Sequence, residues 1–418
     1  MKKQLLSILF LFLTATGCVF SNAHQPSSAT AAERAGRKLS AHILQLTGTH
    51  LKPGQIQHTI QEIPDPAPPY LREDGSVELY GSAPYYIRYK DWATYKSGGR
   101  FEIVGLELQN YSGKPITGTY THPWDLRKYR LTGGGRVRGE VIVGGAMSPR
   151  GAHVTPVWPD DNPNRRIFRF LPVGPHSWRR EARPIVGTVS MSWLGHSYGG
   201  NFFQPESGDL NTVDLAKPVY FVYERVNDDR GNTPFKTEIY IQTLANVMQS
   251  TDDPGVRVIG VGERPWPATR RSIGGYLVEG PRPAVIEAGG RKFYVIGFSS
   301  GDFCTDGYSI NYAWSRDIMG PYQVARTADG RDLLDLGREL KAAYGLSWMG
   351  RPAFYRTPDG DYEVLFHAVD KRILPDNDYS KWPKGDPYQL WQFFRSVFKA
   401  KLAVTLSKAG EPELRIVH

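Results

Sequence analysis

The stretch that decides the fold is residues 276–296, which read YLVEGPRPAVIEAGGRKFYVI. Its last part, residues 292–296, is a run of aromatic and aliphatic side chains that directly follows Gly289-Gly290. A β-rich run that begins at such a turn predicts one strand of a hairpin. An acidic residue, Glu279, precedes this strand in the context Val-Glu-Gly-Pro. The stretch therefore predicts a strand unit with a carboxylate at its entrance.

The same kind of unit recurs along the chain. Runs of β-forming residues bounded by turn residues occur at residues 77–80, 219–223 and 362–366. The chain holds 44 Gly, 31 Pro, 23 Tyr, 18 Phe and 10 Trp, and this combination of turn formers and aromatics favours short strands over helices. A helix is expected only around residues 332–344. The sequence therefore predicts an all-β protein.

The spacing of the units suggests how the strands are arranged. Asp214 and Glu279 are 65 residues apart, and Glu279 and Trp348 are 69 residues apart. A unit of roughly 65–75 residues, repeated five times, would fill residues 50–405, and radially repeated four-stranded sheets form propeller blades. We therefore expect a five-bladed β-propeller over residues 51–418. A β protein with two domains is the alternative.

The N-terminus has the pattern of an export signal. Lys2 and Lys3 precede an apolar stretch at residues 5–13, which is too short to span a bilayer and has the length of a secretory signal. Residues 15–18 resemble a lipobox ending at Cys18, and residues 21–23 would suit an ordinary signal peptidase. We expect a signal peptide over residues 1–23 and a linker or short helix over residues 24–50. The protein would be exported to the periplasm, the cell envelope or the medium, with no membrane contact beyond a lipid anchor.

Charge and cysteine content limit the other function classes. The formal net charge is +9, but the basic residues are scattered, and without a long basic run a nucleic-acid partner is not expected. An acidic substrate or a negatively charged envelope surface remains open. The two cysteines, Cys18 and Cys304, exclude a disulfide framework. Cys304 is interpreted as a packed residue rather than a nucleophile.

Three acids occupy matching places at the starts of strand units. Asp65, Asp214 and Glu279 precede the strands expected at residues 77, 219 and 293. In a propeller the inner strand of each blade lines the central axis, so acids at equivalent positions would converge on one funnel. Two converging carboxyl groups are what glycoside hydrolysis requires.

Several segments resemble glycoside hydrolase family 43, and together they cover most of residues 60–370. The best match runs over residues 293–322 and resembles the family's fourth blade. Its motifs are Phe298-Ser299-Ser300-Gly301, Tyr308-Ser309-Ile310, Ala313-Trp314-Ser315 and Gly320-Pro321-Tyr322. Further likenesses occur in Asp65-Pro66 with residues 72–82, in residues 87–92, in Val278-Glu279-Gly280-Pro281 and in residues 350–368. The likeness is poor over residues 120–200.

The resemblance implies an inverting glycosidase acting on glycans that contain arabinose or xylose. Asp65 would be the general base, Glu279 the general acid and Asp214 a carboxylate that raises the pKa of the acid. No cofactor would be required. The resemblance also makes His367 a tentative ligand of a structural calcium ion in the channel, with an ordinary buried histidine as the alternative.

Other residues are candidates for holding the substrate. Arg282 would contact a sugar hydroxyl or brace a carboxylate. Tryptophans can stack on sugar rings, and the candidates are Trp92, Trp158, Trp193, Trp314 and Trp348, most of which are expected in the core. The Gly-Phe-Ser-Ser-Gly motif at residues 297–301 lacks the helix that a serine nucleophile elbow needs. Two rivals stay open: a carbohydrate-binding propeller without catalysis, and a related propeller enzyme for another sugar.

Overall fold

The computed structural model describes residues 56–61, 65–116, 124–147, 165–187, 196–207, 209–227, 236–260, 278–301, 307–326, 334–370 and 395–417. The chain divides into two compact units, residues 1–46 and 47–418, and all described residues belong to the second. The predicted signal, the linker, Cys18 and Cys304 lie outside the described residues. Within the described part, no helix has the length and hydrophobicity needed to cross a membrane.

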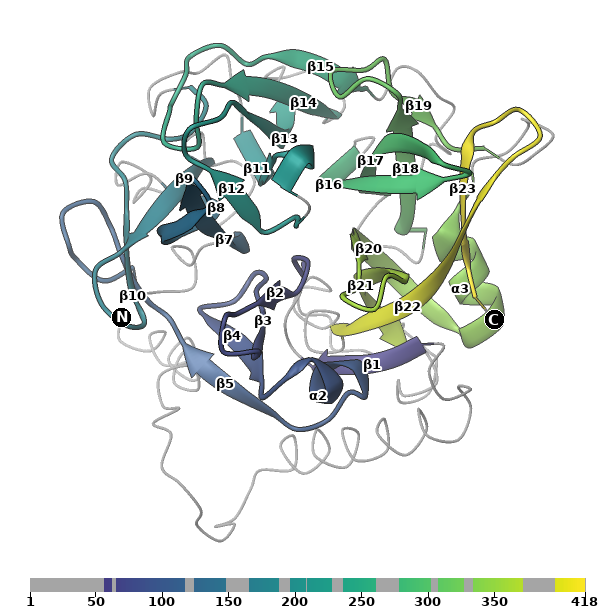
Figure 1. Ribbon diagram of the computed structural model, residues 1–418, viewed down its shortest axis with the longest axis horizontal. Helices are drawn as coiled ribbons and strands as arrows, with labels where there is room; N and C mark the ends of the chain where they lie inside the picture. The colour runs from purple at the N-terminus through teal and green to yellow at the C-terminus, as the bar shows by residue number, and fades with distance from the viewer. Residues whose placement is uncertain are drawn as a thin grey trace, which may run out of the picture. The chain divides into compact units, whose positions relative to one another are not determined.

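Five sheets follow one another along residues 56–417 and surround a common centre (Figure 1). Three of them are simple four-stranded antiparallel sheets. The first comprises β2 (Tyr70–Leu71), β3 (Val77–Leu79), β4 (Tyr85–Tyr89) and β5 (Phe101–Gly105). The third comprises β11 (His196–Phe203), β13 (Val219–Asn227), β14 (Lys236–Leu244) and β15 (Val256–Ile259). The fourth comprises β16 (Val278–Ala288), β17 (Arg291–Ser300), β18 (Ser309–Ser315) and β19 (Gln323–Val324).

The second and fifth sheets have additional strands. The second contains β7 (Trp124–Gly133), β8 (Arg136–Met147), β9 (Arg165–Pro172) and β10 (Ser177–Arg180), flanked by the parallel strands β6 (Glu107–Gln109) and β12 (Thr212–Asp214). The fifth contains β20 (Leu346–Arg356), β21 (Tyr362–Asp370) and β22 (Arg395–Leu406). Both β23 (Pro412–Ile416) and β1 (Ile56–Gln61) pair with β22. The predicted five-bladed β-propeller is confirmed.

The strands begin and end where the turn residues predict. The β-runs at residues 219–223, 292–296 and 362–366 lie within β13, β17 and β21, and the run at residues 77–80 extends one residue beyond β3. The β7–β8 hairpin turns at Gly134 and Gly135, with φ of 60° and 77°, which is the left-handed geometry that a two-residue hairpin loop demands. The Gly-rich run at residues 133–135 is therefore a blade turn.

Helices are few among the described residues. The predicted helix is α3 (Leu336–Tyr344), where the Asp335 side chain accepts the Arg338 N–H and Gly345 ends the helix in the left-handed conformation. A short helix, α2 (Trp92–Lys96), and one turn of 3₁₀ helix, η4 (Pro205–Ser207), were not expected.

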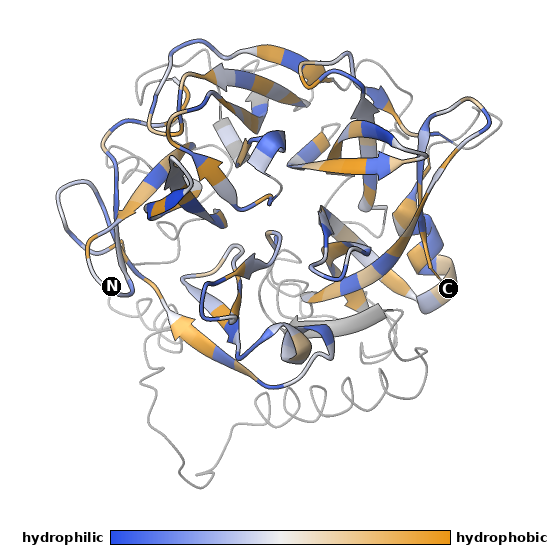
Figure 2. Cartoon of the chain, viewed as in Figure 1, coloured by the Kyte–Doolittle hydropathy of each residue, from blue (hydrophilic) through white to orange (hydrophobic). Residues whose placement is uncertain are grey.

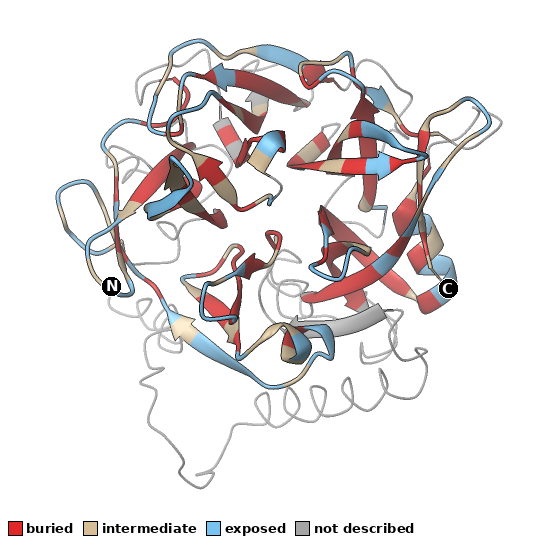
Figure 3. Ribbon diagram, viewed as in Figure 1, coloured by how far each residue is buried: buried red, intermediate tan, exposed pale blue. Residues whose placement is uncertain are grey.

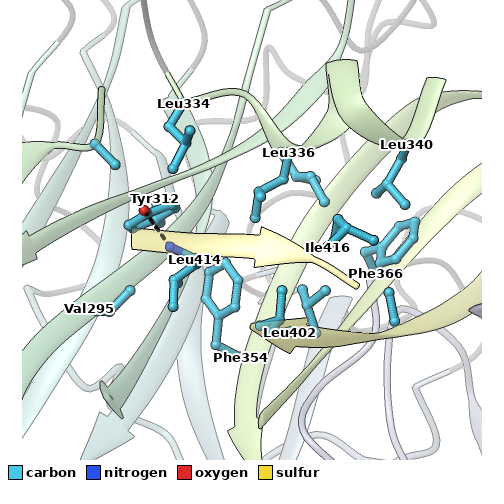
Figure 4. Close-up of a cluster of buried hydrophobic side chains, with 14 of the residues drawn as sticks. Val295, Tyr312, Leu334, Leu336, Leu340, Phe354, Phe366, Leu402, Leu414 and Ile416 are labelled. Carbon is cyan, nitrogen blue, oxygen red and sulfur yellow. Dashed lines mark hydrogen bonds between the residues drawn. The ribbon is translucent and has the colours of Figure 1, made fainter. Parts of the chain in front are cut away.

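The core lies between successive blades. Apolar residues concentrate on the strands in Figure 2, and the same strands are largely buried in Figure 3. The cluster in Figure 4 joins the fourth and fifth sheets, α3 and β23, and includes Val295, Phe354, Leu402 and Leu414. Within it the Tyr312 hydroxyl accepts the Leu414 N–H at 3.0 Å, so the one polar group of this ring is satisfied.

One predicted blade boundary is wrong. The first strands of the five sheets begin at Tyr70, Trp124, His196, Val278 and Leu346. Glu279 therefore lies at the start of the fourth blade, as predicted. Asp214 does not start the third blade, because its strand β12 pairs with β7 and belongs to the second sheet.

Candidate active site

Each blade has a left-handed residue within its first strand or shortly before it. In blade order these are Asp65, Asp125, Gly199, Gly280 and Arg351, with φ of 61°, 51°, 58°, 64° and 56°, and the fifth blade has a second one, Trp348. In the second to fifth blades the left-handed residue lies at a break in strand register. A bulge re-aims the side chains around it, and left-handed non-glycine residues persist only where their surroundings hold them. The left-handed residues of the five blades therefore lie around one common site.

The guanidinium group of Arg351 lies at the centre of this site, and the Arg351 side chain is 10% exposed. Its Nε lies 3.4 Å from Asp65 Oδ1, and its Nη2 lies 3.8 Å from Glu279 Oε2. Its Nη1 lies 3.5 Å from both Asp125 Oδ2 and Glu224 Oε2. Burial lowers the pKa of Arg351, but the carboxylates outweigh burial and hold the pKa well above its ordinary value. One cation therefore joins four carboxyl groups from four other blades.

Asp65 is held on three sides. Its Oδ2 accepts the Ser82 hydroxyl at 2.7 Å, and its own N–H donates to His367 Nδ1 at 3.1 Å. The same Nδ1 lies 3.2 Å from Asp65 Oδ1. Since the amide hydrogen is fixed, Nδ1 is the acceptor, and in a neutral ring the proton then resides on Nε2. His367 thus sets the orientation of Asp65.

The tentative metal role of His367 stays a prediction. The ring is fully buried and stacks on Tyr308 at a centroid distance of 6.1 Å. Among the residues that the structure describes, no group of three His, Cys, Asp or Glu side chains is arranged to hold a metal. Its burial and its contact with the Asp65 N–H favour the alternative, an ordinary buried histidine.

Glu279 is the second carboxylate of the predicted pair. Its Oε1 accepts the hydroxyl of Tyr308, and its Oε2 is directed at Arg351. The side chains of Glu279 and Asp65 are 14% and 16% exposed, whereas those of Asp125 and Glu224 are 2% exposed. Of the four carboxyl groups, these two therefore reach solvent and are open to a substrate.

Asp125 was missed by the sequence reasoning. It lies at the start of the second blade, where its N–H donates to Ser82 Oγ at 2.9 Å and its Oδ1 pairs with Arg282 Nη2 at 3.2 Å. Since Ser82 also donates to Asp65, its hydroxyl links Asp125 to Asp65. The available signal was an aspartate at the start of a strand, in the region where the family resemblance is poorest.

Asp214 does not join the site, which corrects its predicted role. Its carboxylate accepts the Ala216 N–H at 3.0 Å and lies 4.0 Å from Lys217 Nζ, as in an ordinary turn. It pairs with Thr132, seven residues along β7 from Asp125, a separation of about 20 Å in an extended strand. The sequence reasoning took the second strand of the third blade, β13, for its first.

Glu224 is the other missed carboxyl group. It lies within the apolar strand β13, where an acid among Val, Tyr and Phe residues was the only signal. The Gly280 N–H donates to its Oε2 at 3.0 Å. Burial, followed by the nearby Glu279, raises its pKa well above the ordinary value of a glutamate.

Arg282 braces the site from behind. It is 1% exposed and contacts the carboxylate of Asp125 and the carbonyl oxygens of Asp65 and Pro66. This is the carboxylate-bracing role, and a side chain this buried does not reach a sugar.

Two of the described tryptophans have contacts within the protein. Trp314 packs edge-on against Phe293 in the core, and Trp92 Nε1 donates to Asp359 at 3.4 Å. Trp348 is 8% exposed and has a φ of 51° at the inner end of β20, near the site. Trp158 and Trp193 lie outside the described residues. Stacking of any of them on a sugar stays a prediction.

The serine of the Gly-Phe-Ser-Ser-Gly motif is structural. Ser299 lies on β17, is fully buried, and accepts the Arg351 N–H at 2.7 Å. Its hydroxyl therefore fixes the residue that organises the site.

Solved structures share this fold. One is a thermostable family-43 glycoside hydrolase, with a TM-score of 0.57 and 19% identity over 88% of this chain and 96% of that one. A xylan β-1,4-xylosidase from Bacillus halodurans has a TM-score of 0.51 and 14% identity over 87% of this chain, which spans 56% of the xylosidase. An endo-1,5-α-L-arabinanase from Thermotoga petrophila has a TM-score of 0.50 and 15% identity over 86% and 75% of the two chains.

The predicted resemblance to family 43 is confirmed at the level of the fold. The chain is a five-bladed propeller of the kind found in family-43 glycoside hydrolases. No protein-family model matches the sequence, and no curated protein matches it. At these identities the likeness concerns the fold, so the chemistry must be argued from the site itself.

Proposed function

We propose that this protein hydrolyses glycosidic bonds with inversion of the anomeric configuration. The observation that carries the proposal is the pair Asp65 and Glu279: two partly exposed carboxylates, from different blades, on separate nitrogens of one guanidinium. Glycoside hydrolysis by inversion needs one carboxylate as base and one carboxylic acid as proton donor on opposite sides of the bond.

In the proposed reaction, Asp65 takes a proton from a water molecule as its oxygen bonds to the anomeric carbon. Glu279 gives its proton to the leaving oxygen as the old carbon–oxygen bond breaks. The contacts of Asp65 support its role, since Ser82, His367 and Arg351 fix the carboxylate. Arg351 also stabilises its negative charge.

The substrates proposed are glycans that contain arabinose or xylose. Support comes from the fold shared with a xylosidase and an arabinanase. The substrate panel described below identifies which sugar is cleaved. Oligo- or polysaccharide would be the partner, and no cofactor enters the reaction as proposed.

The test starts with aryl arabinofuranosides, aryl xylosides and a polysaccharide panel. Glu279→Gln should abolish turnover of natural glycans while partly sparing substrates with acidic leaving groups, because these need less proton donation. Asp214→Asn is the matched control and should retain full activity. Full activity of Glu279→Gln on natural glycan would rule out Glu279 as the acid.

Proton NMR of the earliest product tests the stereochemistry. Inversion requires room for a water molecule, with the carboxyl groups roughly 6.5–9.5 Å apart rather than about 5–5.5 Å. A product that retains the configuration would contradict the role of Asp65 as base. Saturable glycan binding without any turnover would instead identify a carbohydrate-binding propeller.

A further inference from the structure

Two breaks in strand register lie against each other beside Glu279. In the fourth blade the break covers residues 280–281, directly after Glu279, and in the third blade it covers residues 199–200. A Cβ built on Gly199 would lie 3.0 Å from Pro281 Cδ, so the two breaks are in direct contact. A glycine at this position lets the two backbones approach this closely.

Asn201 joins the two breaks by hydrogen bonds. It is the first paired residue after the break of the third blade, and it is fully buried. Its Nδ2 donates to the carbonyl oxygen of Gly199 at 2.5 Å and to that of Pro281 at 2.7 Å. Residues inside a break are left out of the strand ladder, so the Asn201 amide supplies a partner to one carbonyl group in each break.

The side-chain amide of Asn201 can have only one orientation. Its Oδ1 accepts a hydrogen bond from Arg127 Nη1 at 2.8 Å. A guanidinium group only donates hydrogen bonds and a carbonyl oxygen only accepts them, so the amide oxygen must face Arg127 and the amide nitrogen must face Pro281. A hydrogen bond from a charged donor is also stronger than one between neutral groups. Arg127 therefore locks the amide in the orientation that holds Pro281.

Arg127 is held in turn by the segment that precedes β12. The residue is 1% exposed. Its Nη2 donates to the carbonyl oxygen of Leu210 at 2.5 Å, and its Nε donates to Asn211 Oδ1 at 3.3 Å. Asn211 Nδ2 donates to the carbonyl oxygen of Pro69, next to the first blade, at 2.7 Å. The guanidinium group of Arg127 is thus fixed by acceptors on three residues.

We propose that Asn201 is a positioning residue for Glu279: by fixing the Pro281 carbonyl it sets the bulge of the fourth blade, and the bulge sets the direction of the Glu279 carboxyl group. The inference rests on the proposed function for the role of Glu279 as the acid. A bulge re-aims the side chains around it, and Glu279 is the last paired residue before this one. The Gly280 N–H donates to Glu224, so the third blade holds both residues of the break.

The first arm of the test compares two kinds of leaving group. Asn201→Ala should lower kcat on natural glycan by at least about 10-fold, because a displaced Glu279 donates its proton poorly to the leaving oxygen. Aryl glycosides with acidic leaving groups need less proton donation and should be partly spared, as in Glu279→Gln. A role in stability alone would lower both activities in proportion, since it reduces only the amount of folded enzyme.

Asn211→Ala is the matched control. Asn211 is a second buried asparagine on the same guanidinium group, 3% exposed, but it bonds to Pro69 rather than to Pro281. Its replacement removes similar packing and hydrogen bonding, so urea denaturation should show a similar loss of stability. The ratio of the two activities should stay at the wild-type value. An equal change of this ratio in both alanine variants would overturn the inference.

The second arm needs no substrate. Crystal structures of the wild type and of Asn201→Ala should differ by about 1 Å or more in the Pro281 carbonyl and the Glu279 carboxyl group, whereas Asn211→Ala should match the wild type there. If Asn201→Ala does not fold, Asn201→Asp takes its place. This variant keeps the volume and an acceptor for Arg127, but its carboxylate oxygens repel the carbonyl oxygens, so the same displacement is expected.

The outcomes separate this inference from the proposed function. Displacement of Glu279 in a protein that hydrolyses no glycoside supports the positioning by Asn201, and the proposed function alone fails. An unmoved Glu279 in a folded Asn201 variant, or a proportional loss on both kinds of substrate, overturns the inference. Failure of both Asn201 variants to fold would indicate a purely structural role and overturn it as well.

Discussion

Replacing Arg351 with methionine removes the one cation that four carboxyl groups share. At separations of 3.4–3.8 Å and an effective dielectric constant of ~20, each ionised carboxylate interacts with the guanidinium by ~4–5 kcal/mol before desolvation and mutual repulsion are subtracted. Removing one partner of a buried ion pair costs about 3–5 kcal/mol net. We therefore expect Arg351→Met to lose about 3–5 kcal/mol of unfolding free energy at pH 8.

The pH dependence distinguishes charge from packing. Without Arg351 the carboxylates repel one another, and lowering the pH relieves this by protonation, so the loss should be about 1–2 kcal/mol smaller at pH 5 than at pH 8. Urea denaturation of the wild type and of Arg351→Met at pH 5 and pH 8 measures this difference in unfolding free energy. An equal loss at both pH values would refute the electrostatic reasoning and leave only lost packing.

Three further variants are informative. Gly280→Ala should destabilise the fold by more than about 1 kcal/mol in urea, because a Cβ would lie 2.0 Å from Arg351 Cδ at a φ of 64°; wild-type stability would contradict this. Tyr308→Phe removes a hydrogen bond to Glu279, so the alkaline limb of kcat/KM should rise by about one pH unit; a fall would refute it. Asp214→Asn should stay within about 0.5 kcal/mol of wild type, with an unchanged pH profile.

The fold was predictable because its signals are local. Each predicted strand starts at a turn such as Gly289-Gly290 and continues as a β-branched or aromatic run, so hairpins can be read without knowing their neighbours. The ring of blades followed from repetition. Blade boundaries were harder, since β11 contains Gly199 and Gly200 and carries a weak strand signal, which is why β13 was taken for the first strand of its blade.

The site was only half predictable. Asp65 and Glu279 precede or begin their blades in recognisable contexts, and the structure brings both to Arg351. Glu224 could not be found in this way, because it comes from the middle of a second strand and its function depends on a neighbour far away in sequence. No sequence pattern distinguishes Arg351 from the other basic residues. Its four carboxylate partners come from four other blades and become apparent only in the fold.

The pairing of β1 with β22 has a consequence for biosynthesis. Ile56 pairs with Ala400, so the strand just before Asp65 finds its partner only after the chain has been made through about residue 400. Contacts between such distant segments form slowly, and the fifth sheet is completed only when β1 reaches β22. Arg351 and His367 also come from that last sheet. We therefore expect a chain that stops before the fifth sheet to lack the guanidinium that joins the four carboxyl groups.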